Sequence, residues 1–367
     1  MRKLVTLRKI DSISSIEGAE KIELAHTGGW QCVVGKGQFT PGETAVFFEI
    51  DSALDVNDPR YEFLKKNCYR VWKQGNGTVI DECIRIRTIR CMGNISQGLF
   101  MPLSLFPEIP KEACLGDDLT GILKVRHYDE IKEHAEIVGG KARLAGNAKG
   151  NFPTSIVPKT DEERLQNLTE YFETMKDVEF ECTEKFDGSS ATYIYAPVIR
   201  PANPFFVCSR NLELQEEEGN LYWEIAKKYD LLHKMAQWCW DKTIHSDTGT
   251  FAQIAIQGEI VGPGVNNNRD QYIDHEFRVF RIYDVTWNTW FYAHKRREIA
   301  EKLDLPHVKL IRDRWKVFQD LHTMDDFIKF VQGKTDRGHE REGMVWKSID
   351  GRNSFKVINP EYLLKEK

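Results

Sequence analysis

The spacing of the apolar runs changes along the chain, and this change divides it into two parts. Up to about residue 110 the runs are short and are separated by turn-forming pairs such as Gly28-Gly29 and Pro41-Gly42. Many short strands with frequent turns indicate a small antiparallel β-barrel, and an OB-like fold is the expected form. From Pro158 onward longer strands alternate with a helical pattern over residues 222–236. The sequence therefore predicts an α+β protein that begins with a β-barrel.

The length of the chain supports two domains, because 367 residues exceed the usual size of a single domain. We expect an OB-like nucleic-acid-binding domain in residues 1–110 and a second domain in residues 158–367. Residues 111–157 are expected to connect the two through a short charged helix over 127–140 and an exposed loop over 142–153.

Composition excludes several classes of protein. Apolar residues make up 41% and charged residues 29%, which is typical of a soluble globular protein. No apolar run approaches the ~20 residues that cross a bilayer, so we expect no membrane association. The first 15 residues lack the apolar stretch and cleavage site of a signal peptide. The eight cysteines form no C-x-x-C pair, which favours reduced thiols in a cytoplasmic protein over disulfides or a zinc site.

Because the net charge is −5, any basic surface that binds nucleic acid must be confined to a small part of the protein. Arg85 and Arg87 lie two residues apart, hence on one face of a strand, with Arg90 nearby. Such a stripe suits a nucleic-acid groove. The alternative, a solvated face of the barrel, explains the same pattern equally well.

The segment Glu184-Lys185-Phe186-Asp187-Gly188 is the sharpest local motif. It follows a strand-like run in which alternate residues from 178 to 182 are apolar, so Lys185 and Asp187 project together from the other face. Glycine permits a sharp turn or a close approach to a ligand. A lysine nucleophile must be neutral, and its ordinary pKa makes this cost about 4 kcal/mol at pH ~7.4 unless the site helps.

K-x-D-G alone also occurs in exposed turns, and its significance comes from the motifs that follow it in order. Gln257-Gly258-Glu259 ends a strand in which alternate residues share a face, and residues 277–280 (FRVF) open another. Residues 341–345 (REGMV) place Glu342 on the same strand face as Met344 and Trp346, and residues 354–358 (SFKVI) supply Lys356. Each motif alone is compatible with a salt-bridged strand, but the ordered set is not.

This ordered set resembles the covalent nucleotidyltransferases, which comprise ATP- or NAD-dependent ligases and capping enzymes. Within that superfamily the chain looks like the Deinococcus/Naegleria-type RNA ligases, the fifth RNA-ligase family. The segments that carry the resemblance cover nearly the whole chain: GAEKIELAHTGGWQCVVGKGQFTPGE, ISQGLFMPL, TDEERLQNL, EKFDGSS, SRN, IQGEIVGPG, FRVFRIYDV, REGMVWK and SFKVIN. The resemblance implies a nucleotidyltransferase domain of antiparallel sheets flanked by helices after the OB domain.

The resemblance also implies an ATP-dependent RNA ligase that joins 3′-hydroxyl and 5′-phosphate ends. In such enzymes a lysine attacks the α-phosphate of ATP, AMP passes to the RNA 5′-phosphate, and the 3′-hydroxyl then displaces AMP. The expected partners are ATP and RNA, with nicks that carry an RNA 3′-hydroxyl strand as the favoured substrate. We expect a monomer.

The resemblance assigns the nucleotide contacts to motif positions. Lys185 would be the nucleophile. Glu184 would contact the adenine edge and Phe280 would stack on its face, with Phe277 as a second choice for the stack. Glu259 would accept a hydrogen bond from a ribose hydroxyl.

The resemblance likewise assigns the metal and phosphate contacts. Asp187 and Glu342 would hold Mg²⁺ (or Mn²⁺), through waters, since Mg²⁺ keeps much of its hydration shell. Lys356 would neutralise the α-phosphate and lower the pKa of the nucleophile. Arg164 would bind the departing phosphates, and Arg210 the ribose or an acceptor phosphate.

Two features of the last motif test this arrangement. The superfamily often has K-x-K there, but Ile358 occupies the second lysine position, so either Lys356 acts alone or another cation substitutes. Residues opposed across a hairpin share a face. Glu342 and Lys356 would therefore share one only with a three- or five-residue loop or a bulge, and we predict such a loop with a positive φ at Gly351.

Two other functions remain open. A DNA ligase is the enzymatic alternative, although DNA ligases and capping enzymes carry their OB domain after the last motif, whereas here the barrel-like segment comes first. An NAD-dependent ligase would need a nicotinamide-recognition module, which we do not find. A catalytically silent RNA-binding protein on the same scaffold is the alternative from another class. It would be expected to lack a motif lysine or acid, and all are present.

Overall fold

The computed structural model describes residues 2–138, 147–246 and 249–365 and forms two compact units. Unit 1 comprises the described parts of Met1–Ala142 and Pro360–Lys367, together with Leu165–Thr169. Unit 2 comprises the described part of Arg143–Arg164 together with Glu170–Asn359. Among the described residues there is no helix with the length and apolar character needed to span a membrane.

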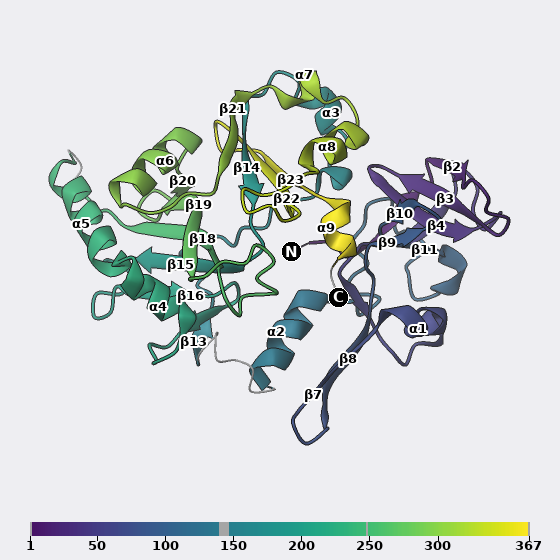
Figure 1. Cartoon of the computed structure of the whole chain (residues 1–367), viewed down its shortest axis with the longest axis horizontal. Coiled ribbons are helices and arrows are strands. Elements are labelled where there is room, and N and C mark those ends of the chain that lie inside the picture. The colour runs from purple at the N-terminus through teal and green to yellow at the C-terminus, as the bar shows by residue number, and fades with distance from the viewer. Residues whose placement is uncertain (1, 139–146, 247–248, 366–367) are drawn as a thin grey trace. The chain divides into compact units, whose positions relative to one another are not determined.

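Unit 1 is built from short antiparallel strands, as the sequence predicts (Figure 1). They form four small sheets in the orders β1-β5-β11, β2-β3-β4, β10-β9 and β12-β6-β8-β7. The strands are β1 (Val5–Lys9), β2 (Ser12–Ser15), β3 (Ile22–Thr27), β4 (Trp30–Gly35), β5 (Thr44–Phe48), β6 (Ser52–Leu54), β7 (Tyr69–Lys73), β8 (Val79–Arg85), β9 (Ile89–Cys91), β10 (Asn94–Ser96), β11 (Leu99–Pro102) and β12 (Arg126–His127). The helices are η1 (Pro59–Leu64), α1 (Lys65–Cys68), η2 (Leu103–Leu105), α2 (Tyr128–Val138), η3 (Leu165–Asn167) and α9 (Pro360–Leu364).

The segment Leu165–Thr169 is bonded into unit 1 although it lies far along the chain. The Asn167 side chain accepts hydrogen bonds from Arg8 Nη2 at 2.6 Å and Trp30 Nε1 at 2.7 Å, and donates to Glu49 Oε1 at 2.7 Å. Trp30 is in turn part of an aromatic core with Phe47, at 5.6 Å between ring centroids. These polar bonds hold the returning segment against the barrel core.

The suggested arginine stripe on β8 is wrong, because Arg85 is buried. Its guanidinium pairs with Asp51 at 2.8 Å and lies 4.0 Å from the centroid of the Tyr128 ring. Arg90 pairs with Glu361 at the other end of the chain. Arg85 therefore stabilises the unit rather than forming an exposed cationic groove.

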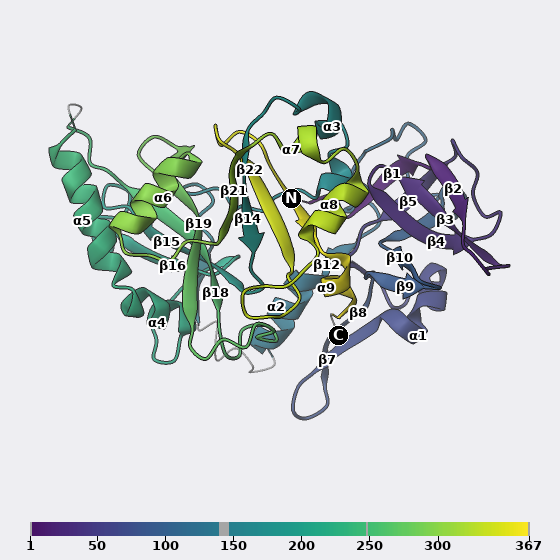
Figure 2. The ribbon, with the colours of Figure 1, turned by 45° about the horizontal axis from the view of Figure 1, so that its top comes forward.

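The described part of unit 2 contains two antiparallel sheets. The larger has the order β13-β17-β16-β15-β18-β19-β20, and the smaller the order β21-β14-β22-β23. Figure 2 labels β15, β16, β18 and β19 of the larger sheet and β14, β21 and β22 of the smaller. The strands are β13 (Ala148–Asn151), β14 (Phe180–Lys185), β15 (Ser189–Tyr195), β16 (Phe205–Cys208), β17 (Leu212–Leu214), β18 (Ile254–Val261), β19 (Glu276–Asp284), β20 (Thr289–Trp290), β21 (Leu310–Trp315), β22 (Gly343–Ser348) and β23 (Ser354–Ile358). The helices are α3 (Tyr171–Thr174), α4 (Leu221–Lys228), α5 (Leu231–Ile244), α6 (Ala293–Lys302), α7 (Val317–Asp320) and α8 (Met324–Val331).

Two expectations for the local structure need correction. The helical pattern over residues 222–236 belongs to two helices, α4 and α5, and most of its apolar residues lie in the core, whereas Leu232 is exposed. The two helices are separated at Asp230, which has φ 52° and so breaks the helical path. The expected loop over 142–153 contains β13, whose partner is β17. The sequence of β13 does not alternate between apolar and polar residues, because all of its residues are exposed at the edge of the sheet. Its pairing with β17 is also irregular.

The smaller sheet has two unlike faces because residues alternate along its strands. One face carries Phe180, Trp346 and Phe355, each fully buried. The paired rows Thr183–Val345–Lys356 and Lys185–Gly343–Ile358 lie on the opposite face. Both lysines of the predicted site thus project from the same side of this sheet.

Candidate active site

Lys185 ends β14, and its amine contacts the acid that precedes the neighbouring strand. Lys185 Nζ lies 2.6 Å from Glu342 Oε1, and both side chains are partly buried. β14 pairs with β22 so that Lys185 is opposite Gly343, which follows Glu342. A side chain at Gly343 would meet the Val357 carbonyl oxygen at 2.3 Å, so only glycine permits β23 to pack this closely.

The predicted loop between the last two strands is wrong in length, and Glu342 reaches the site for another reason. The hairpin pairs Gly343 with Ile358, and four residues, 349–352, separate the bonded Ser348 and Asn353. Gly351 has φ 73°, as predicted. The alternation of side chains begins at Gly343, where β22 begins. Glu342 lies before β22, so strand alternation does not apply to it. Its side chain contacts Lys185 and does not join Met344 and Trp346 in the core.

Glu259 and Asp187 are brought to the same amine by the close packing of β15 on β18. Glu259 is opposite Ser190 in the ladder. Gly188 lies between Asp187 and this ladder, and a Cβ there would be 2.3 Å from the Ile260 carbonyl oxygen and 2.7 Å from Glu259 Cγ. The glycine of the motif is therefore required for a close approach between two strands.

The charges around Lys185 act in the opposite direction to the one expected. Burial by itself would lower the pKa of the Lys185 amine, but Glu342, Glu259 and Asp187 raise it above its ordinary value. Burial raises the pKa of Glu259 to about 8, with Glu342 and Asp187 adding to the rise and Lys185 opposing it. The net shift in the pKa of Lys185 is therefore set by the nearby acids, and a lowering effect of Lys356 stays a prediction.

The segment before η3 supplies two acids, Asp161 and Glu162, to which the sequence motifs assign no role. Lys356 N donates to the Glu163 carbonyl at 2.8 Å, and a parallel bridge joins Arg164 to Lys356. The same segment places Asp161 2.5 Å from Lys356 Nζ and 3.4 Å from Arg210 Nη2. Arg164 is 5% exposed, whereas the Arg210 side chain is half exposed. The structure thus gathers the three predicted cations along one short segment.

The two aromatic candidates have different environments. Phe277 is fully buried in the core, edge to face with Tyr193 at 5.2 Å, so the second choice for the adenine stack is wrong. Phe280 is the extra residue of a bulge, since Gln257 pairs with Arg281 and Gly258 with Val279. Phe280 is only partly buried.

Lys347 is a further cation on the site face, two residues beyond Val345. Its ammonium donates to the Phe280 carbonyl at 3.1 Å and lies 4.0 Å from Glu162 Oε1. Burial lowers the pKa of Lys347 to about 7, with Glu162 opposing the shift. Burial alone would raise the pKa of Glu162, but Lys347 and Arg281 hold it below its ordinary value. The alternation of residues 343, 345 and 347 is the sequence signal that could have identified this lysine.

Glu184 is 4% exposed and lies opposite Met344, so alternation places it on the other side of β14 from Lys185. Its backbone N–H donates to the Lys309 carbonyl at 2.9 Å. Burial raises the pKa of the Glu184 carboxyl, with Arg341 and Lys309 opposing the shift.

A divalent cation in this site would be held largely through water. The described part of the chain has no group of three or more acidic, histidine or cysteine side chains arranged to hold a metal ion. Glu342 and Asp187 both act on the Lys185 amine, so their oxygens lie in one region of the site. Mg²⁺ keeps several of its waters and needs only one or two protein carboxylates, which these two residues supply. Asp187 and Glu342 are the acids expected to hold it.

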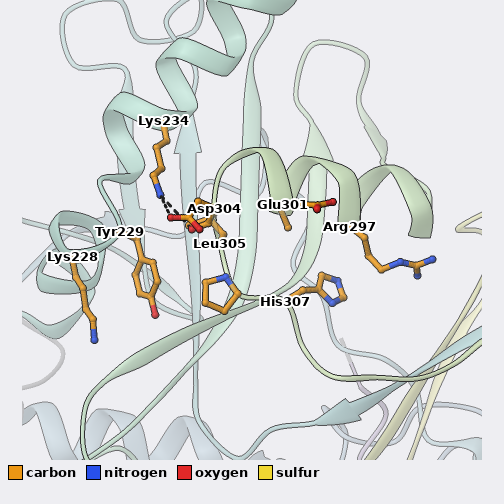
Figure 3. Close-up of a pocket in the computed structure, with 10 residues that line it drawn as sticks. Lys228, Tyr229, Lys234, Arg297, Glu301, Asp304, Leu305 and His307 are labelled. Atoms are coloured by element: carbon orange, nitrogen blue, oxygen red, sulfur yellow. Dashed lines mark hydrogen bonds and ion pairs between the residues drawn. The ribbon is translucent and has the colours of Figure 1, made fainter.

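A surface pocket of about 630 Å³ lies elsewhere in unit 2 (Figure 3). Two of its cations are already paired: Lys234 Nζ is 3.6 Å from Asp304 in the pocket lining, and Arg297 is 2.6 Å from Glu181, which lies outside the lining. Both ring nitrogens of His307 are also bonded, to Arg296 at 3.0 Å and to the Val308 carbonyl at 2.7 Å. None of the residues predicted for the site lines this pocket.

Comparison with known proteins matches both parts of the chain. An OB-fold domain model matches residues 4–103, and an RNA ligase model matches residues 178–358. No match was found among curated proteins.

Solved structures of Naegleria gruberi RNA ligase are similar over the whole length. A lysine-to-methionine mutant with AMP and Mn, a glutamate-to-alanine mutant with ATP and Mn, and the enzyme with pyrophosphate each share 33% identity with this chain. Each has a TM-score of 0.82, covering 100% of this chain and 99% of the other. With this identity over its full length, the chain belongs to the RNA ligase family, with an OB-fold domain followed by a sheet-rich nucleotidyltransferase-like domain.

Proposed function

We propose that this chain is an ATP-dependent RNA ligase that joins 3′-hydroxyl and 5′-phosphate ends through AMP bound covalently to Lys185. The observation that carries the proposal is the Lys185 amine, 2.6 Å from Glu342, on a sheet face that also bears Lys356. The similar ligase from Naegleria gruberi has been solved with ATP and Mn, which supports ATP and a divalent cation, Mg²⁺ or Mn²⁺, for this chain.

In the first step Lys185 Nζ forms a bond to the α-phosphorus of ATP, and the bond from that phosphorus to the pyrophosphate oxygen breaks. The amine must lose a proton, which the neighbouring carboxylates oppose by raising its pKa. A divalent cation on Asp187 and Glu342 would compete for the Glu342 carboxylate and neutralise phosphate charge. Glu342 is therefore the group whose partner must change before Lys185 can react.

The other residues of the site bind and orient the nucleotide. Lys356 is placed to neutralise the α-phosphate, and Arg164 is proposed to bind the departing phosphates. Glu259 accepts from a ribose hydroxyl and Phe280 stacks on the adenine. No adenine contact is proposed for the Glu184 side chain, because it is buried on the other side of β14 from Lys185. Lys347 fixes Phe280 by bonding its carbonyl at 3.1 Å, so the stacking ring is anchored through its own backbone.

In the later steps the RNA 5′-phosphate displaces Lys185 from AMP, and the 3′-hydroxyl then displaces AMP from the activated end. Arg210 is half exposed, which suits contact with an acceptor phosphate or ribose. In this proposal residues 1–110 of unit 1 bind the nucleic acid, and unit 2 carries the chemistry. The expected connection over residues 111–157 is divided between the units, since its described part up to residue 138 belongs to unit 1. Nicks with an RNA 3′-hydroxyl strand are the favoured substrate.

The state and location of the protein are part of the same proposal. All eight cysteines are free thiols, which supports a reducing, cytoplasmic environment. We propose that the enzyme acts as a monomer.

The decisive experiment is incubation of the purified protein with α-labelled ATP and Mg²⁺, followed by a denaturing gel. Label should stay with the protein, and Lys185→Ala should lose it. Labelled GTP should give no product. A protein that never retains label would instead be the catalytically silent RNA-binding form. Sealing of nicked RNA against nicked DNA then separates RNA ligase from DNA ligase.

A further inference from the structure

The loop between β18 and β19, residues 262–275, holds Asp187 from one side. The side-chain amide of Asn266 donates to Asp187 Oδ1 at 2.7 Å and to the Gly188 carbonyl at 2.9 Å. Arg269 Nε lies 4.0 Å from Asp187 Oδ2. One loop therefore supplies a donor or a positive charge to each carboxylate oxygen.

The position of Asn266 in the loop is set by its backbone conformation and by its neighbours, and not by the hydrogen bonds of its own side chain. Asn266 has φ 46°, a left-handed conformation that asparagine tolerates better than most residues. The preceding Val265 is 2% exposed and packs into the core. Asn268 closes the loop, since its side chain accepts from Tyr272 N and donates to Tyr272 O, both at 2.9 Å. The amide of Asn266 is thus aimed by a preformed backbone.

The same loop contacts the segment that leads to Glu342. Thr335 Oγ1 donates to Asp270 Oδ1 at 2.9 Å, and the Arg337 guanidinium lies 4.0 Å from the centroid of the Tyr272 ring. The loop begins directly after the strand that carries Glu259. It therefore touches the turn after Lys185 and the approach to Glu342, and can set the spacing of the acids on both.

We propose that Asn266 is a positioning residue that fixes the Asp187 carboxylate, so that Asp187 and Glu342 present their oxygens to one divalent cation. This inference rests on the proposed function, in which those two acids hold the metal. A hydrogen-bond donor behind a metal ligand orients it before the metal arrives, and its removal typically weakens metal binding by about 10- to 100-fold.

The test compares Asn266→Gly with Asn268→Gly in the full chain. Glycine keeps the left-handed conformation at either position, so each variant removes only side-chain hydrogen bonds. Mn²⁺ binding is measured by electron paramagnetic resonance of the free ion, in the presence of a non-hydrolysable ATP analogue. Asn266→Gly should raise the Mn²⁺ dissociation constant about tenfold. Asn268→Gly loosens the loop but keeps the Asn266 amide, so it should lower the unfolding midpoint and raise the Mn²⁺ dissociation constant by clearly less than Asn266→Gly does.

A second readout is the rate of covalent adenylylation against Mn²⁺ concentration. Asn266→Gly should shift the half-saturating Mn²⁺ concentration and restore a near wild-type rate at saturation, which a general loss of structure would not do. An unchanged dissociation constant in Asn266→Gly, or an equal rise in both variants, overturns the positioning role. A wild-type protein that binds Mn²⁺ but never becomes adenylylated overturns the proposed function instead.

Discussion

The two faces of the smaller sheet in unit 2 come from the same strands and differ completely in their physics. On one face Trp346 and Phe355 stack at 5.0 Å between ring centroids, with Phe327 at 5.4 Å from Trp346. On the other face Glu181 and Lys347 are paired neighbours, both at least nine-tenths buried. The aromatic face stabilises the sheet by removing apolar surface from water. The charged face is costly to bury, and its charges are offset by buried partners such as Arg296 beside Glu181.

The largest change in stability should come from the aromatic face. Phe327→Ala removes a fully buried ring that also lies 5.4 Å from Phe318. We expect a loss of about 4 kcal/mol in the free energy of unfolding, because the site cannot close around the cavity. Chemical denaturation measures it. A loss below about 1 kcal/mol would show that this face is not the main support of the sheet.

Removing one partner of a buried ion pair on the charged face should lower the free energy of unfolding almost as much. Glu181 is fully buried and binds both Arg296, which is 3% exposed, and Arg297 at 2.6 Å. Glu181→Ala leaves Arg296 buried without its carboxylate, and we expect about 3 kcal/mol of destabilisation.

The control is the exposed pair of Glu179 and Arg314, 3.2 Å apart. Glu179→Ala should cost less than about 1 kcal/mol, because solvent screens such a pair. Equal losses in Glu181→Ala and Glu179→Ala would contradict the view that burial sets the strength of this network.

Substitution of Lys356 should affect the rate of adenylylation much more than the stability of the fold. Lys356 is 11% exposed but its partner Asp161 is 39% exposed, so Lys356→Ala leaves Asp161 in contact with water and should change the unfolding midpoint less than Glu181→Ala does. We expect the rate of adenylylation to fall about 100-fold, or roughly 3 kcal/mol of transition-state stabilisation, because a cation beside the α-phosphate is lost. Single-turnover labelling with α-labelled ATP measures this. Normal labelling would mean that another cation neutralises the α-phosphate. Such a cation is one of the two options left by Ile358, which occupies the place of the second lysine in the last motif.

The smallest effect should be seen in the dependence of stability on pH. Burial alone would raise the pKa of Glu181, but Arg296 and Lys347 hold it below its ordinary value. A carboxylate with a lowered pKa stabilises the folded state above the unfolded pKa of about 4.3, and the contribution is lost as the pH falls through the folded pKa. The difference in stability between the wild type and Glu181→Gln should therefore shrink below about pH 4. A constant difference down to pH ~2 would contradict this linkage.

Strand alternation and motif order were sufficient to predict much of the site. Apolar residues at alternate positions before Lys185 placed its side chain on the face opposite Phe180 and Cys182, and both of these are fully buried. The same reasoning failed for Glu342, because alternation applies only inside a strand and β22 begins one residue later. It also failed for Arg85, whose partner Asp51 lies 34 residues away in the chain.

By itself, then, the sequence determined the succession of a β-barrel and an α+β unit, the lysine and acids of the motifs, and the glycine turn at Gly351. These follow from local rules: turn chemistry, side-chain period and residue type. Tertiary structure decided the register that puts Lys185 and Lys356 on one face, and the return of Asp161 to Lys356. It also decided that carboxylates raise the pKa of Lys185. Those outcomes depend on distances between residues far apart in the chain, which no local pattern specifies.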